Sequence, residues 1–257
     1  MIYVTSKHAS VSVVGSEACD VLRKFISRST LSHDSAVADL HLQHSDQGLV
    51  LHWTQGAKKP LKFHIDYHKE LLKHRSLPAP KQGAFNQALG KKTRSVIDAT
   101  GGWGGDAILM CMQGYEVTII ERLPLMVALI EDGLRRLSKA PAFLEGQLNL
   151  PKVVCAEAED FLVSSNDHAD CVYLDPMFPA KKKKSAASNK NMQLLQWLAG
   201  PDLDADEVAI AAVEHYSRVA VKRPDYARPL AEELIGKPST QFSSKLVHYD
   251  VYVSPKA

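Results

Sequence analysis

Four glycines fall within five positions of this chain, between a short apolar run at residues 95–97 and a helical apolar run that begins at residue 107; they are Gly101, Gly102, Gly104 and Gly105. Glycine permits a positive φ and lets a ligand lie against the backbone. The start of a helix adds unpaired N–H groups. A strand, a glycine-rich turn and a helix N-terminus in this order predict a cradle for a nucleotide-like ligand. A tight turn without a ligand is the alternative, and four glycines in one turn disfavour it.

Acidic residues flank this turn. Asp98 ends the strand before the glycines, Asp106 follows them, and Glu121 ends the next strand-like run at residues 116–121. A carboxylate at the position of Glu121 can accept both hydroxyls of a ribose. Asp98 suits a ligand that carries an ammonium group and repels a pyrophosphate. The two carboxylates therefore favour S-adenosylmethionine as the cofactor, although Gly102-x-Gly104-x-x-Ala107 also fits the dinucleotide fingerprint.

A second motif follows the apolar run at residues 171–174, and it reads Asp175-Pro176-Met177-Phe178-Pro179. It is similar to the turn of enzymes that methylate exocyclic amino nitrogens. We expect Asp175 and the carbonyl group of Pro176 to accept the amine hydrogens, and Phe178 to stack on a base turned out of its helix. An ordinary proline turn after a buried strand is the competing interpretation.

Positive charge gathers beside this turn, although the net charge of the chain is only +2. A lysine run follows the turn directly, and two more basic residues end a later strand; together they are Lys181, Lys182, Lys183, Lys184, Lys222 and Arg223. Such a run is often no more than a solvated loop. Next to the proposed catalytic turn, it predicts a rim that contacts RNA phosphates.

From residue 95 onward, strand and helix patterns alternate, which predicts an α/β fold with a doubly wound, mainly parallel sheet. Residues 245–253 alternate as a closing antiparallel last strand. Before this part, period-two runs at residues 37–42, 49–53 and 61–65 predict an antiparallel meander. We therefore expect a small N-terminal α+β subdomain at residues 1–76 and a catalytic domain at residues 77–257. Asp202 or Asp204 is expected to cap the helix at residues 205–214.

Other features of the sequence bear on the cellular location of the protein and on whether it has disulfides or a metal site. The four cysteines are scattered, which indicates reduced thiols rather than a disulfide frame. The start of the chain has no long apolar run, so no signal peptide is expected. The histidines between residues 41 and 74 lack partners at ligand spacing, so we expect them to face solvent and bind no metal. These features predict a cytoplasmic protein without a metal or a membrane span, and we expect a monomer.

Five longer motifs carry a resemblance to a known family: residues 98–107 around the glycines, Glu121-Arg122-x-Pro124, residues 173–179, residues 200–206 and residues 221–227. Together they resemble the ribosomal RNA small subunit methyltransferase J family, closely over the last two-thirds of the chain. This resemblance implies a Rossmann-like class I methyltransferase that uses S-adenosylmethionine to form N2-methylguanosine in bacterial 16S rRNA, on the naked RNA or on the small ribosomal subunit.

The family's cofactor contacts carry over to Gly105 and Asp106, to Glu121 and Arg122, to the pair Glu157-Ala158 and to Asp175, which is thus expected beside both cofactor and substrate. Family members often carry arginine in place of Gly105 and a Ser-Ser pair in place of Glu157-Ala158. Contact at Gly105 is therefore expected through its backbone, and the Glu157 carboxylate could accept the adenine amino group.

Several alternatives stay open at this point. The same catalytic turn serves enzymes that methylate the amino group of adenine or a protein glutamine. An NAD-dependent oxidoreductase would need a catalytic Tyr-Lys or His-Asp pair near the glycines, and no pair has convincing spacing. A non-catalytic RNA-binding module would have a damaged catalytic turn, and this turn is intact.

Overall fold

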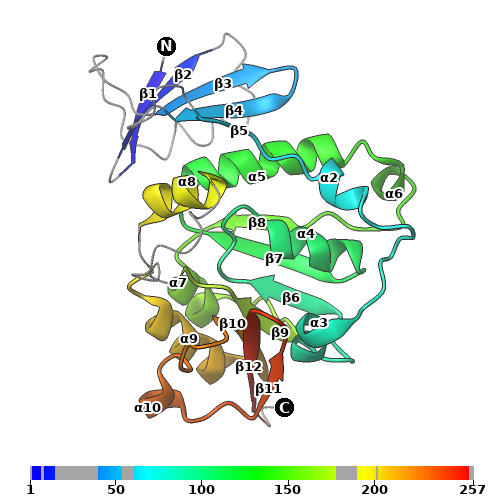
Figure 1. Ribbon diagram of the computed structural model, residues 1–257, viewed down its shortest axis with the longest axis vertical. Helices are drawn as coiled ribbons and strands as arrows, with labels where there is room; N and C mark the ends of the chain where they lie inside the picture. The colour runs from blue at the N-terminus through cyan, green and yellow to red at the C-terminus, as the bar shows by residue number, and fades with distance from the viewer. Residues whose placement is uncertain are drawn as a thin grey trace.

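Two β-sheets and the helices around them form the computed structural model of the chain (Figure 1), which describes residues 2–6, 9–14, 40–53, 61–177, 190–200 and 202–254. The N-terminal sheet has five strands in the order β1-β2-β3-β4-β5. They are β1 (Ile2–Ser6), β2 (Ala9–Val14), β3 (Leu40–Ser45), β4 (Gly48–Trp53) and β5 (Leu61–Phe63). Strands β3 to β5 form an antiparallel meander, as the alternating runs predict. Strand β2 lies outside this meander and pairs in parallel with β3.

The main sheet has seven strands in the order β11-β12-β10-β9-β6-β7-β8. They are β6 (Ser95–Asp98), β7 (Glu116–Glu121), β8 (Lys152–Cys155), β9 (Cys171–Leu174), β10 (Arg218–Pro224), β11 (Thr240–Ser243) and β12 (Val247–Val253). Strands β6 to β10 are parallel, and β12 lies antiparallel between β10 and β11. The predicted doubly wound sheet is confirmed. The chain order reverses between β6 and β9, and ligands bind at such a point beyond the carboxyl ends of the strands.

Helices cover both faces of this sheet. On one face lie α3 (Gly83–Leu89), α4 (Gly105–Met112), α5 (Pro124–Leu137) and α8 (Lys190–Ala199), together with the short helix α2 (His68–Leu71). On the other face lie α7 (Ala158–Ser164) and α9 (Ala205–His215), against which α10 (Glu232–Ile235) packs. The remaining helix, α6 (Pro141–Leu144), follows α5. Within the described ranges, no helix has the length and apolarity that a membrane crossing requires.

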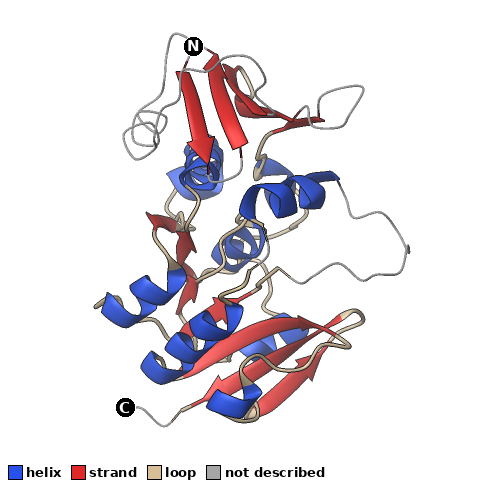
Figure 2. Cartoon of the chain, turned by 90° about the vertical axis from the view of Figure 1, so that its left-hand side faces the viewer, coloured by secondary structure: helices blue, strands red, loops and turns tan. Residues whose placement is uncertain are grey.

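Helix α5 lies between the two sheets, and the side view shows the N-terminal sheet stacked beyond the helices that cover the main sheet (Figure 2). Ten of its 14 residues are buried. The first core therefore continues from Leu49 and Leu51 of β4, through α5, to the main sheet. Aromatic contacts extend this junction, with Phe63 of the N-terminal sheet 4.1 Å from the ring of Trp103 in the glycine turn. The two sheets thus share one hydrophobic core.

One buried carboxylate joins α5 to the N-terminal sheet. The Asp132 side chain is 1% exposed. Its Oδ2 accepts hydrogen bonds from the backbone N–H of Leu49 at 2.9 Å and from Arg136 at 3.0 Å, and its Oδ1 accepts from Arg135 at 2.8 Å. Burial opposes ionisation, but these hydrogen bonds outweigh it and hold the pKa of Asp132 below its usual value.

We predict that Asp132→Ala lowers the free energy of unfolding by about 3 kcal/mol, because it leaves the largely buried Nε of Arg136 and the buried N–H of Leu49 without their acceptor. Denaturant unfolding of the purified variant measures this change. Since a lowered pKa stabilises the fold above the unfolded value and not below the folded one, the loss should shrink as the pH falls below about 4.

The matched control is Asp167→Ala, which breaks a pair between Lys152 and Asp167 whose side chains are 62% and 45% exposed. Its cost should stay within about 1 kcal/mol. An equal loss in both variants would contradict the role assigned to Asp132.

Candidate functional site

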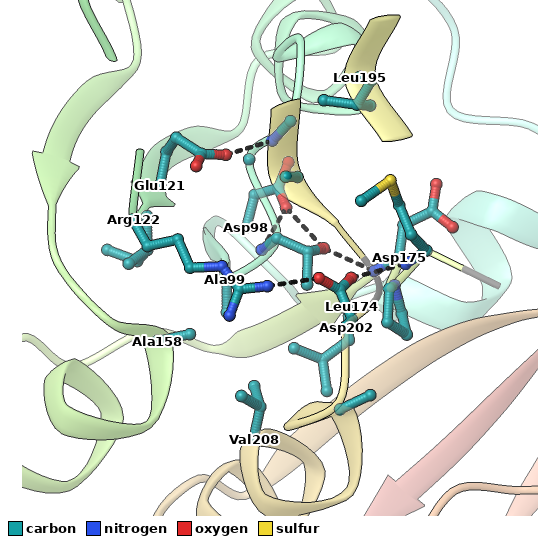
Figure 3. Close-up of a pocket in the computed structure, with 18 of the residues that line it drawn as sticks. Asp98, Ala99, Glu121, Arg122, Ala158, Leu174, Asp175, Leu195, Asp202 and Val208 are labelled. Carbon is teal, nitrogen blue, oxygen red and sulfur yellow. Dashed lines mark hydrogen bonds and ion pairs between the residues drawn. The ribbon is translucent and has the colours of Figure 1, made fainter. Parts of the chain in front are cut away.

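A cavity of about 450 Å³ opens at the carboxyl ends of β6, β7, β8 and β9, where the chain order reverses. Its volume lies in the range of small-molecule sites. Eleven residues that the sequence predicts for the site line it: Asp98, Gly101, Gly102, Gly105, Asp106, Glu121, Arg122, Glu157, Ala158, Asp175 and Pro176. They come from turns that lie far apart in the sequence, and Figure 3 shows several of them converging on one space.

The glycine turn forms one wall of the cavity. A Cβ atom on Gly101 would lie 2.6 Å from the Ile119 side chain and 2.9 Å from the carbonyl oxygen of Ile120, so no larger residue fits there. Gly104 has a φ of +71°, and a Cβ atom there would meet the Tyr67 hydroxyl at 2.4 Å. Gly104 does not line the cavity. Its role is therefore to allow the conformation of the turn rather than to contact a ligand. The space around Gly105, by contrast, is open.

Two buried carboxyls stand on either side of the turn (Figure 3). Glu121 accepts from the backbone N–H groups of Gly102 at 2.9 Å and Leu123 at 2.8 Å, so its carboxyl fixes the turn to the end of β7. Asp98 accepts from the N–H of Thr100 at 3.2 Å. Burial raises the pKa of Asp98 to about 8, with a contribution from the nearby Asp106, and burial raises the pKa of Glu121 to about 7. Both carboxyls thus face a cavity in which donors or a cation of a ligand would stabilise their charged forms.

The turn after β9 is held at both ends. The backbone N–H of Asp175 donates to Thr100 Oγ1 at 2.6 Å, and that of Met177 donates to Asp202 Oδ2 at 2.7 Å. These bonds link the turn to the end of β6 on one side and to the loop before α9 on the other. The Asp175 carboxyl is therefore presented to the cavity by a fixed backbone.

A lysine joins two of the carboxylates. Lys222 Nζ lies 2.7 Å from Asp175 Oδ2 and 2.9 Å from Asp106 Oδ2, and the Tyr173 hydroxyl donates to the same Asp106 oxygen at 2.5 Å. Burial opposes the charge of Lys222, but the two carboxylates outweigh it and raise its pKa above the usual value. Burial likewise raises the pKa of Asp175, and the charge of Lys222 opposes that rise.

Arg122 closes another side of the cavity. Its guanidinium binds Asp202 at 2.5 Å and Asp204 at 2.7 Å, and it lies 3.9 Å from Glu157. Asp204 is the N-cap residue of α9, as one of the two expected positions, and its carbonyl oxygen accepts from the N–H of Val208 at 3.0 Å, but its side chain makes no capping hydrogen bond. The carboxylates of Asp202 and Asp204 pair with Arg122, and Asp202 also accepts from the backbone of the turn after β9.

The predicted basic rim falls into two parts. Residues 178–189, with Phe178, Lys181, Lys182, Lys183 and Lys184, lie outside the described residues. Lys222 and Arg223 end β10, but Lys222 points to carboxylates and Arg223 is 8% exposed, with its guanidinium donating to the carbonyl oxygen of Arg228. Neither therefore lies on an open surface, and RNA contact by these residues stays a prediction.

The described ranges also bear on the expectations about metal ligands and disulfides. There, no three His, Cys, Asp or Glu side chains gather as metal ligands. The buried cysteines Cys111 and Cys171 carry thiols rather than a disulfide.

Sequence reasoning missed several residues that build the site. Thr100 binds Asp175, Tyr173 binds Asp106 and Asp202 binds Arg122, so each contacts a residue of the predicted set. Helix α8 adds Met192, Leu195 and Gln196 to the cavity lining. Asp202 lies in one of the motifs that carried the family resemblance, so that motif was the signal that could have found it, whereas nothing in the local pattern marks the residues of α8.

Comparisons with known proteins agree with this geometry. Residues 24–254 match the family model described as "Putative SAM-dependent methyltransferase". A ribosomal RNA small subunit methyltransferase J from Haemophilus ducreyi is 39% identical over 88% of this chain and 89% of its own length. The corresponding protein from Aeromonas salmonicida is 39% identical over 74% of this chain and 77% of its own length. The crystal structure of a SAM-dependent methyltransferase from Neisseria gonorrhoeae shares the fold, with a TM-score of 0.66, 22% identity and 96% of both chains covered.

The raised pKa values of Asp98 and Glu121 predict a pH dependence of stability. A carboxyl whose folded pKa exceeds its unfolded value of about 4 stabilises the fold fully below that value, and this contribution is lost as the pH rises through the folded pKa. We therefore predict that Asp98→Asn flattens the decline in the free energy of unfolding between pH 5 and pH 8. The difference in slope should be on the order of 1 kcal/mol per pH unit, measured by denaturant unfolding of the ligand-free protein.

Glu121→Gln should have a similar effect that ends near pH 7, where its own carboxyl titrates. Asp46→Asn, at an exposed position of the β3–β4 turn, is the control and should leave the slope unchanged. Parallel curves for wild type and Asp98→Asn would mean that Asp98 is ionised in the folded protein.

Proposed function

Since the chain belongs to the ribosomal RNA small subunit methyltransferase J family of S-adenosylmethionine-dependent methyltransferases, we propose that it methylates the exocyclic N2 of a guanosine in bacterial 16S rRNA. The observation that carries this proposal is the turn after β9, whose backbone is held at Asp175 and at Met177 beside the cavity. The family membership sets aside the NAD-dependent oxidoreductase and the non-catalytic module.

The cavity fits the cofactor in its donor and acceptor chemistry. The buried carboxyl of Asp98 suits the ammonium group of the methionine part. The Glu121 carboxyl, at the end of β7, suits the ribose hydroxyls. Apolar lining from Ile120, Ala156 and Val208 supplies a surface for the adenine ring, and Glu157 is available for its amino group. Gly101 leaves no room for a side chain where the turn meets β7, which keeps the cavity wall close to the strand.

The reaction needs alignment more than acid–base chemistry. Bound S-adenosylmethionine would supply an activated methyl group. The amine nitrogen would form its N–C bond as the S–C bond breaks, S-adenosylhomocysteine would leave, and one amine proton would pass to solvent. The nitrogen lone pair of an exocyclic amine is delocalised into the ring, so the site has to hold the amine hydrogens. We propose that the Asp175 carboxylate and the Pro176 carbonyl accept them, and that Phe178 stacks on the turned-out base.

A ribose hydroxyl is a weaker candidate as the methyl acceptor, although a lysine now stands near the turn. Such a reaction calls for a base that takes the hydroxyl proton. Lys222 binds two carboxylates that raise its pKa, so its ammonium group stays protonated and cannot serve as that base. The amine therefore remains the favoured acceptor. Action as a cytoplasmic monomer without a metal ion stays a prediction.

The first test is the identity of the product. Small-subunit rRNA from a strain that lacks the gene should have lost N2-methylguanosine, and the wild-type gene should restore it, as measured by nucleoside mass spectrometry. The gene with Asp175→Ala should not restore it, because removal of an acceptor that orients the amine costs the transition state more than the ground state. In vitro, we expect turnover to fall by at least about a hundredfold.

Calorimetry with S-adenosylhomocysteine is the control, since binding by Asp175→Ala, even if weakened, reports a folded cavity. Near-normal turnover of this variant would make Asp175 a structural residue only. Loss of N6-methyladenosine from the deletion strain, with N2-methylguanosine unchanged, would replace guanine by adenine as the target.

The second test concerns the lysine run. We predict that replacing Lys181, Lys182, Lys183 and Lys184 by glutamine weakens RNA binding and flattens its salt dependence. The log–log salt slope should fall by about 0.7 to 0.9 for each phosphate that the protein no longer neutralises. Binding to small-subunit rRNA at several salt concentrations measures the slope.

The matched control replaces Lys91 and Lys92, which are exposed before β6, at the end of the sheet opposite to the carboxyl ends of the strands. Their removal should leave the salt slope unchanged. If the slope stays the same in both variants, the lysine run is a solvated loop and the RNA surface lies elsewhere.

A further inference from the structure

Strand register brings Lys222 to the catalytic turn. Val221 of β10 pairs with Leu174 of β9, so the next residues along these parallel strands, Lys222 and Asp175, are neighbours. The ammonium group of Lys222 lies 2.7 Å from Asp175 Oδ2. Asp175 lines the cavity and Lys222 does not. Lys222 can therefore affect a bound base through Asp175, rather than by direct contact.

The surroundings of the Asp175 carboxyl are otherwise acidic or neutral. The titratable side chains near it come from six places in the fold: Asp98 (β6), Asp106 (α4), Tyr173 (β9), Asp202 (before α9), Lys222 (β10) and Tyr249 (β12). Burial, Asp106 and Asp202 all raise the pKa of Asp175, and Lys222 lowers it. Without Lys222 this carboxyl would hold a proton to a higher pH.

The protonation state of Asp175 decides which hydrogen bonds it can make. An ionised carboxylate only accepts hydrogen bonds, whereas a protonated carboxyl also donates one. Lys222 occupies one site on Oδ2, and among the described residues none donates to Oδ1. Asp175 therefore offers the cavity an edge of acceptors as long as it is ionised.

The three bases with an exocyclic amine differ in the ring atom beside that amine. In guanine one of the two ring neighbours is N1–H, which donates, so an ionised carboxylate on that side can accept from the ring and the amine together. In adenine and cytosine the neighbour is a ring nitrogen with a lone pair, which an ionised carboxylate repels and a protonated carboxyl would bind. A buried acceptor that faces another acceptor costs binding free energy. An ionised Asp175 thus favours guanine over the other two.

We propose that Lys222 is a positioning residue that keeps Asp175 an acceptor-only carboxylate, and that this charge state selects guanine as the methylated base. The inference rests on the proposed function, because it explains the choice of base at that same site. It assigns Lys222 to the reaction, in place of the RNA rim that its position at a strand end predicted.

The test compares Lys222→Met with Lys222→Arg and the wild type, using small ribosomal subunits from a strain that lacks the gene. The acidic limb of kcat/KM reports the ionisation of the free enzyme. In Lys222→Met this limb should move at least one pH unit higher. At pH values below the limb, the kcat/KM of the variant should therefore fall at least about tenfold further than that of the wild type. Lys222→Arg, which keeps the charge, should restore most of the shift.

A readout without RNA accompanies the kinetics. Carbon-13 NMR of aspartate-labelled protein, with the Asp175 signal assigned through Asp175→Asn, follows the carboxyl directly and should show the same upward shift in Lys222→Met. Lys152→Met removes another lysine–aspartate pair, whose residues do not line the cavity, and should change neither the limb nor the signal. Calorimetry with S-adenosylhomocysteine checks that each variant keeps its cavity.

Three outcomes would overturn the inference. A rate of Lys222→Met that falls equally at every pH, with the Asp175 signal unmoved, would leave Lys222 a purely structural role. A further shift of the acidic limb on adding Lys222→Met to Asp175→Asn would mean that Lys222 acts through another group. If the wild type forms N6-methyladenosine, N4-methylcytidine or a 2′-O-methylated ribose, the proposed function itself fails, and the base selection fails with it.

Discussion

The fold has to compensate the charges of several carboxyl groups that lie close together at the cavity. Asp98, Asp106, Asp175 and Asp202 converge at the carboxyl ends of neighbouring strands, where burial opposes the charges of Asp98 and Asp175 and the neighbouring carboxylates add repulsion. Two cations, Lys222 and Arg122, compensate this cluster from within the described chain. Each cation bridges two carboxylates, so each also sets the relative positions of the elements that carry them. The same ion pairs that make the cluster tolerable therefore hold the walls of the cavity together.

The parts of the fold that could be predicted are those whose pattern is local. Strands β7 and β9 have the bounds of the runs at residues 116–121 and 171–174, because each is a short, largely apolar run with a clear start and end in the sequence. Strand β11 was missed, since its residues are mostly exposed and only pairing with β12 makes it a strand. The pattern at residues 229–235 predicts a helix over all seven positions, but α10 begins only at Glu232, and Ala231 just before it has a φ of 44°. Interactions that are distant in sequence decided both differences.

The same contrast between local patterns and long-range pairing applies to the residues of the site. The glycines, Asp98, Glu121 and Asp175 could be found from motifs, because each follows a strand whose end is visible in the sequence. The environment of Lys222 could not, since it depends on which strand lies beside β10. A lysine at a strand end is as consistent with a solvated rim as with an internal ion pair. Register between β9 and β10 decides between them, and no local pattern contains that register.

Helix α5 has a consequence for how the enzyme would choose its target. It packs against both sheets, and Asp132 fastens it to β4. The N-terminal sheet and the methyl-transfer domain therefore share one packed core, which sets the separation between the N-terminal sheet and the Asp175 carboxyl. An RNA segment bound on that sheet would have to lie at a set distance from the nucleotide that enters the cavity. The target would then be selected by this distance as well as by its base.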